Sequence, residues 1–110
     1  MTYDEDLADR VRAAIGDLPG VTEKRMFGGL GFLVNGHLAV SASSRGGLML
    51  RVDPADLESV LAEEGVSPFE MHGRSMNGWV HVDASAAASP DQLDRWVSVG
   101  TTYAASLPPK

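Results

Sequence analysis

An Asn-Gly pair between two apolar runs restricts the folding of this 110-residue chain more than any other feature. The run before it, Arg25 to Val34, is the longest apolar stretch, and the run after it covers His37 to Ser43. Asn-Gly is favoured in a two-residue type I′ hairpin turn, because both turn residues need a positive φ. The sequence therefore predicts a strand, a tight turn at Asn35 and Gly36, and a returning strand.

The pairing of these two strands can be predicted residue by residue. A two-residue turn places Val34 opposite His37 and Leu33 opposite Leu38. Continued without interruption, the register gives the further pairs Phe32 with Ala39, Gly31 with Val40, and Gly29 with Ala42.

Both faces of the predicted hairpin are largely apolar. Alternation places Leu30, Phe32 and Val34 on one face, and Leu33 and Leu38 on the other. A sheet that is wetted on one side alternates apolar and polar residues, so this pattern favours a central strand covered on both sides. We expect helices on one side and a partner subunit on the other, with Leu30, Phe32 and Val34 forming the interface.

Three glycines, Gly28, Gly29 and Gly31, lie within the first apolar run. Glycine-rich loops can bring backbone N–H groups close to a phosphate, but such loops lead from a strand into a helix. Here the glycines lead into Phe-Leu-Val and the hairpin turn. We therefore interpret them as a bulge or a place of close backbone packing.

A helix is predicted before the hairpin. Thr2 and Glu5 match a capping box, and Leu18-Pro19-Gly20 ends the helix. Its apolar stripe consists of Leu7, Val11, Ala14, Ile15 and Leu18.

A third strand and a short helix follow the hairpin. The strand covers Leu48 to Val52, and Asp53 and Pro54 supply the N-cap and first position of the helix, which ends at Gly65. Glu63 and Glu64 lie at its C-terminal end, where the helix dipole favours cations. That end should be frayed or paired with a basic residue.

The last third of the chain reads as a packed loop, a strand and a helix. Residues 66–78 are rich in loop-forming types, and Trp79 to Val82 is a fourth strand. Ser89 and Gln92 form a second capping box. Gly100 lies on the apolar stripe of the last helix, where an unneeded glycine costs about 1 kcal/mol, so we expect close backbone contact there.

These elements predict an α+β fold in one domain over residues 1–110. Their order is α-β-β-β-α-β-α, with helices packed on an antiparallel sheet of about four strands.

Charge and composition exclude several classes of function. The net charge is −6, with nine Lys and Arg against fifteen Asp and Glu, so direct nucleic-acid binding is not expected. There is no cysteine, which removes disulfides and thiolate sites. The acidic N-terminus does not resemble a signal peptide and no stretch reaches transmembrane length, so we expect a cytoplasmic protein without a membrane partner.

The sequence offers few candidates for chemistry. His37, His72 and His81 lack a metal-ligand spacing, and Gly73-Arg74-Ser75-Met76 is not a nucleophile elbow. We therefore expect no catalytic residue, no metal and no cofactor. Arg25, Arg51 and Arg74 could converge on an anion, or they could pair with the chain's own excess of carboxylates.

Several segments together resemble the TfoX (Sxy) N-terminal domain family. The most distinctive is Arg25-Met26-Phe27-Gly28-Gly29, and the likeness extends through Gly47 to Val52 and Gly73 to Val80. The resemblance implies a small α/β domain with an antiparallel sheet. Its named members regulate natural competence together with the cyclic-AMP receptor protein and carry a second, helical domain. This chain ends at Lys110, so we expect a stand-alone single-domain member, and the five residues above serve as a family signature, not as an active site.

Two functional hypotheses follow. The first is a non-enzymatic cytoplasmic regulatory or adaptor domain that binds proteins, itself included as a homodimer, through Leu30, Phe32 and Val34. The second is a small-ligand or anion-binding module that uses Arg25, Arg51 and Arg74.

Overall fold

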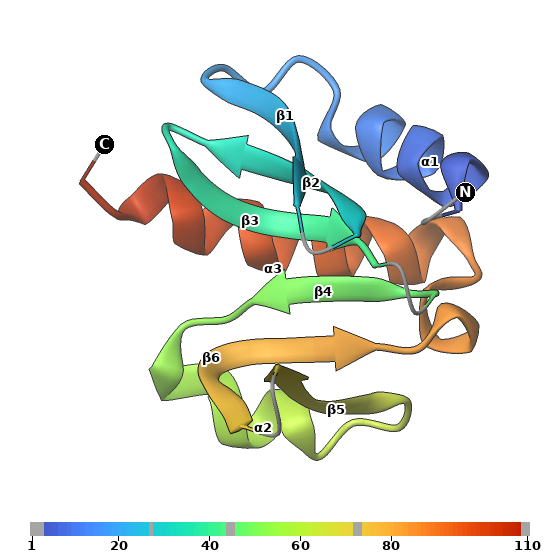
Figure 1. The fold of residues 1–110 in the computed structure, drawn as a ribbon, viewed down its shortest axis with the longest axis vertical. Helices are drawn as coiled ribbons and strands as arrows, with labels where there is room; N and C mark the ends of the chain where they lie inside the picture. Colours follow the sequence, from blue (N-terminus) through green and yellow to red (C-terminus); the bar gives the residue numbers. More distant parts are fainter. Residues whose placement is uncertain (1–3, 27, 44–45, 72–73, 109–110) are drawn as a thin grey trace.

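The chain forms one antiparallel sheet with helices packed on it (Figure 1). A computed structural model describes residues 4–26, 28–43, 46–71 and 74–108. The strands are β1 (Val21–Met26), β2 (Gly29–Val34), β3 (His37–Ala42), β4 (Leu48–Arg51), β5 (Val66–Met71) and β6 (Arg74–Val82). The helices are α1 (Glu5–Ile15), α2 (Leu57–Leu61) and α3 (Pro90–Ser106), with the 3-10 turns η1 (Pro54–Asp56) and η2 (Ala84–Ala87). The α+β class is confirmed, with six strands in the order β1-β2-β3-β4-β6-β5 in place of about four.

The first additional strand arises because the run from Arg25 to Val34 is not one strand. Residues 21–26 form β1, the chain turns around Gly28, and β2 begins at Gly29. Gly28 has φ +76°, a conformation that a residue with a Cβ adopts only at a cost. The glycines therefore end one strand and start its neighbour, and β2 leads into another strand, not into a phosphate-binding helix.

The second additional strand lies in residues 66–78, which we expected to be a packed loop. The segment contains β5 and the first part of β6, which pair as an antiparallel hairpin. β5 is an edge strand, and its register shifts between Pro68 and Glu70. Proline and an irregular register are tolerated at an edge, so loop-forming residues do not prevent a strand there.

The Asn-Gly hairpin has the predicted turn and only part of the predicted register. Asn35 and Gly36 have φ of 52° and 88°, as a type I′ turn requires. The pairs of Val34 with His37 and of Leu33 with Leu38 are confirmed. Beyond them a β-bulge shifts the register. The remaining pairs are therefore Phe32 with Val40, Gly31 with Ser41 and Leu30 with Ala42.

The first helix begins later than expected. Asp4 is the N-cap of α1, and its carboxylate accepts hydrogen bonds from the backbone N–H groups of Asp6 and Leu7. The proposed cap Thr2 lies outside the described residues. The helix ends at Ile15, before the expected Pro19-Gly20 stop, because the chain turns at Gly16 with φ +60°.

The other helix signals hold. Ser89 and Gln92 form the predicted capping box of α3. The Asp53 side chain caps η1 and accepts a hydrogen bond from the Ala55 N–H. Beyond the C-terminal end of α2, Glu63 pairs with Arg95 at 2.5 Å, so that end has its basic partner.

The core lies between one face of the sheet and the helices. Figure 1 shows α3 crossing behind the sheet, and Val11 of α1 and Val97 of α3 lie in the same core cluster as the strand residues. The expected close contact at Gly100 is confirmed, because a Cβ there would come 2.5 Å from the Ala39 carbonyl oxygen. The strand residues of the core cluster are Leu30, Phe32, Val34, Ala39, Val40, Ala42, Leu48, Leu50, Val80 and Val82.

The opposite face of the sheet is not covered by any helix in the described part of the chain. Residues paired across antiparallel strands point to the same face, so the register defines this face as a set of rows. One row crosses all six strands and consists of Lys24, Gly31, Ser41, Met49, His81 and Ser67. Beside it lie the row Thr22, Leu33 and Leu38 and the pair Arg51 and Trp79. We call these residues together the helix-free face.

Candidate functional site

The structure places the expected interface residues in the core of a single chain. Leu30, Phe32 and Val34 are 7%, 1% and 1% exposed, beneath the chain's own helices. A partner could reach these side chains only if the helices moved away. On the other side of the same strands, the middle of the helix-free face is also buried at Gly31, Ser41 and Met49, so a partner could reach only its more exposed parts.

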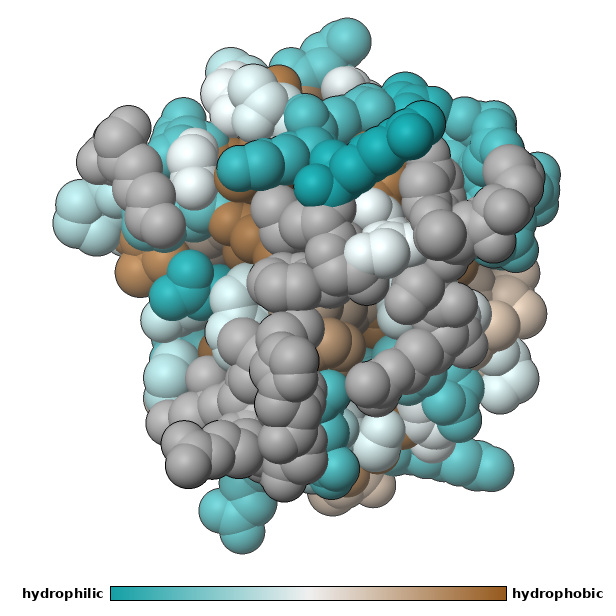
Figure 2. All heavy atoms as spheres, viewed as in Figure 1, coloured by the Kyte–Doolittle hydropathy of each residue, from teal (hydrophilic) through white to brown (hydrophobic). Residues whose placement is uncertain are grey.

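The helix-free face combines apolar and polar side chains. Leu33, Leu38 and Trp79 are partly exposed, whereas Met49 is buried without belonging to the core cluster. Figure 2 views the molecule from this side and shows small patches of hydrophobic surface beside hydrophilic side chains. The feature that distinguishes interfaces from other surface is enrichment in aromatic residues, methionine and arginine, and this face carries Trp79 and Arg51.

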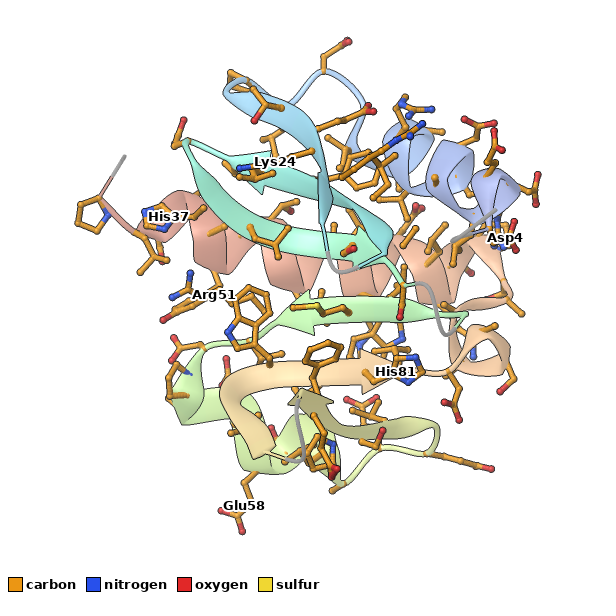
Figure 3. All side chains as sticks on the ribbon, viewed as in Figure 1. Asp4, Lys24, His37, Arg51, Glu58 and His81 are labelled. Atoms are coloured by element: carbon orange, nitrogen blue, oxygen red, sulfur yellow. The ribbon has the colours of Figure 1, made fainter. Side chains whose placement is uncertain are left out.

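The described residues of the helix-free face include two cations, and one carboxylate lies at its edge. Lys24 and Arg51 are its cations, and Figure 3 shows both of them, together with His81, on the side of the sheet that faces the viewer. No Asp or Glu occurs in the rows that define it, but the carboxylate of Asp83 lies 3.4 Å from Nδ1 of His81. Lys24 and Arg51 thus place positive charge on this face in a chain whose net charge is −6.

Arg51 is held by two aromatic rings. Its Cζ atom lies 5.4 Å from the centroid of the Trp79 ring on β6 and 5.5 Å from that of Tyr103 on α3. Both distances are within the range of a cation–π interaction. The rings restrict the guanidinium without using its N–H donors as salt bridges do.

Three other arginines have structural partners. Arg10 donates to the carbonyl oxygens of Ala87 and Ala88. Arg12 hydrogen-bonds to both carboxylate oxygens of Glu23 and thereby lowers the pKa of that carboxyl. Arg95 does the same to Glu63, whose pKa is also lowered.

The three arginines of the anion hypothesis are not brought together. Arg25 is paired with Leu30 and thus points to the helix side of β1, whereas Arg51 lies on the helix-free face of β4. Three strand spacings separate β1 from β4 in the sheet, which amounts to about 14 Å. The Arg74 side chain lies outside the described residues. Arg25 and Arg51 therefore cannot bind one small anion together.

The signature residues surround the β1–β2 turn. Phe27 and the side chain of Met26 lie outside the described residues, and Arg25 is exposed. Gly28 takes the positive φ of the turn, and a Cβ at Gly29 would collide with the Ala42 carbonyl oxygen of β3. Gly28 and Gly29 therefore have a structural role in bringing β2 close to its neighbours.

The histidines of the described segments bind protein oxygens. His37 Nε2 lies 2.6 Å from the Pro108 carbonyl oxygen, and His81 Nε2 lies 2.8 Å from that of Gly46. Within the described segments, no group of three or more His, Asp or Glu residues could hold a metal ion. Nor does any helix there have the length and apolar character needed to cross a membrane.

Comparison with known proteins decides the family. Residues 13–104 match the family described as TfoX N-terminal domain. The chain belongs to this family. A search of curated proteins and a search of solved structures gave no significant match. The match includes all six strands, the last turn of α1 and most of α3, and a TfoX N-terminal domain is a regulatory domain.

Sequence reasoning identified Arg51 in this TfoX domain but not the aromatic residues around it. Trp79 was recognised as a strand residue, and its place beside Arg51 depends on β4 pairing with β6, two strands separated by β5 and a helix. Tyr103 approaches from α3, and no local pattern indicates that contact.

Proposed function

We propose that this TfoX domain is a non-enzymatic regulatory adaptor of the cytoplasm that binds another protein through the helix-free face. The observation that carries the proposal is the composition of that face. It presents Leu33, Leu38 and Trp79, partly exposed, beside the stacked Arg51. Aromatic residues and arginine are enriched in protein interfaces and dominate their binding energy. Membership of a regulatory family supports the same conclusion.

The edges of the sheet are less suitable for a partner. Edge strand β1 carries three consecutive charged residues, Glu23, Lys24 and Arg25. Edge strand β5 contains Pro68 and a register shift. Charged side chains, proline and bulges on edge strands hinder the addition of a strand from another chain. We therefore assign the partner to the face.

A second copy of the chain is the alternative partner, as a homodimer requires. A symmetric dimer through the helix-free face would bring the same cationic patch, with Lys24 and Arg51, together from both copies. Like charges facing one another across an interface disfavour association. A different protein therefore fits this face better than a second copy does.

The test compares two glutamate substitutions in a tagged protein expressed in its native cells. Leu38→Glu places a charge on the helix-free face, whereas Ala105→Glu places one on the exposed side of α3. We expect a partner to co-purify with the wild type and with Ala105→Glu, and to be lost with Leu38→Glu.

Two results would contradict the proposal. One is a partner that both variants retain equally, which would point to another surface. The other is a light-scattering mass of two chains that Leu38→Glu reduces to one, which would support the homodimer.

A further inference from the structure

Arg51 is a preorganised cation that has no anionic partner in the described part of the chain. The rings of Trp79 and Tyr103 hold the guanidinium of Arg51. None of the guanidinium N–H groups makes a hydrogen bond or ion pair to a described residue. Arg51 is half-buried, so part of the residue is exposed to solvent. The contrast with Arg12 and Arg95, which bind carboxylates through two nitrogens each, shows which type of partner is lacking.

This arrangement is suited to binding a carboxylate. A guanidinium presents parallel N–H donors that match the two oxygens of a carboxylate, and such bonds are stronger than those between neutral groups. Aromatic stacking fixes the side chain before binding, so less conformational entropy is lost when the partner arrives.

The surroundings of Arg51 favour a protein segment over a polyanion. Lys24 and Arg51 are the only Lys or Arg residues in the rows that define the helix-free face, whereas nucleic-acid binding depends on many phosphate contacts. Leu33, Leu38 and Trp79 on the same face offer apolar surface, which a nucleic-acid backbone does not use. An acidic residue with apolar neighbours complements both features.

We infer that the helix-free face binds a segment of a partner protein in which an Asp or Glu carboxylate, flanked by apolar residues, binds to the guanidinium of Arg51. The inference rests on the proposed function, because it names the chemistry of the partner at the same face. The apolar neighbours of the carboxylate pack on Leu38 and Trp79, and the carboxylate determines the register of the segment.

The experiment selects peptides from a random library on the immobilised domain and measures the affinity of the synthesised winners. We expect the winners to share an acidic residue with apolar neighbours. Arg51→Gln should weaken them by about tenfold, the effect of losing one charge-assisted contact. Arg25→Gln is the matched control on the other face of the sheet and should leave the affinity unchanged.

A double-mutant cycle shows whether the contact is direct. Changing the peptide's Glu to Gln should also cost about tenfold, and the same change should cost nothing further on Arg51→Gln. An amide NMR spectrum of Arg51→Gln that retains the wild-type dispersion shows that the variant is folded. Additive losses would overturn the inference.

The remaining outcomes separate this inference from the proposed function. Peptides without acidic residues that bind Arg51→Gln normally but fail on Leu38→Glu would overturn the carboxylate contact and leave the adaptor function in place. Failure to select any peptide, or winners unaffected by either substitution, would overturn both.

Discussion

Replacing Gly100 with alanine tests whether α3 rests directly on the sheet. A Cβ at this position would come 2.5 Å from the Ala39 carbonyl oxygen and 2.7 Å from Cδ1 of Leu50. The leucine methyl group can rotate away. The carbonyl belongs to the backbone of β3, so the alanine side chain has to push helix and strand apart.

Two opposing effects determine how far Gly100→Ala changes the free energy of unfolding. Alanine is about 1 kcal/mol more favourable than glycine in a helix interior. Overpacking a core costs about 1 to 3 kcal/mol. We take the upper end because the alanine Cβ would collide with a backbone atom, the Ala39 carbonyl oxygen. The free energy of unfolding should therefore fall by about 2 kcal/mol, out of about 5 to 15 kcal/mol for a typical domain.

Urea denaturation followed by circular dichroism measures this change, with stability taken from the midpoint and slope of the transition. Thr102→Ala is the control, because it raises helix propensity on the exposed side of α3 and should stabilise by about 0.5 kcal/mol. If Gly100→Ala is as stable as the wild type or more stable, α3 does not contact β3 as closely as described.

Three further predictions use the same assay. Arg95 lowers the pKa of Glu63, so its stabilisation is present above the unfolded pKa of about 4.3 and is lost as the pH falls through the lower folded value. Glu63→Gln should therefore cost up to about 1 kcal/mol at neutral pH and nothing in strong acid, and a loss that persists in acid would argue against the ion pair. Gly36→Ala should cost about 1 to 2 kcal/mol, because φ is 88° there, and an unchanged midpoint would argue against the type I′ turn. Phe32→Ala should cost about 3 to 5 kcal/mol without altering the light-scattering mass, whereas a change of mass in a stable variant would assign Phe32 to an interface.

The features that the sequence predicted correctly depend on a few neighbouring residues. The turn at Asn35 and Gly36 and the capping box at Ser89 are set by backbone geometry within one turn of chain. Gly100 was predicted to contact another backbone because a glycine in a helix interior is destabilising unless close packing requires it. The sequence did not indicate which strand it contacts.

The strand count could not be predicted because its signals were ambiguous. The turn between β1 and β2 lies inside an apolar run, where no polar turn pair marks it, and Gly28 fits a bulge as well as a turn. No residue pattern marks the bulge in β3 either. The predicted register is therefore wrong beyond the pair of Leu33 with Leu38. Residues 66–71 contain loop-forming residues, which led us to predict a loop where β5 lies. Such residues are tolerated in an edge strand, and the sequence alone does not show that β5 lies at the edge.

The side of the sheet that the helices cover is a property of strand order, which no single strand reveals. Both faces of β2 are apolar, and only pairing with distant strands distinguishes them. The row of Leu30 continues into Leu48 and Val82, both fully buried, and so belongs to the core. The row of Gly31 continues through Ser41 and Met49 to His81, so it contains polar side chains and belongs to the other face. The same pairing of β4 with β6 places Trp79 beside Arg51, so the candidate surface exists only once the whole sheet has assembled.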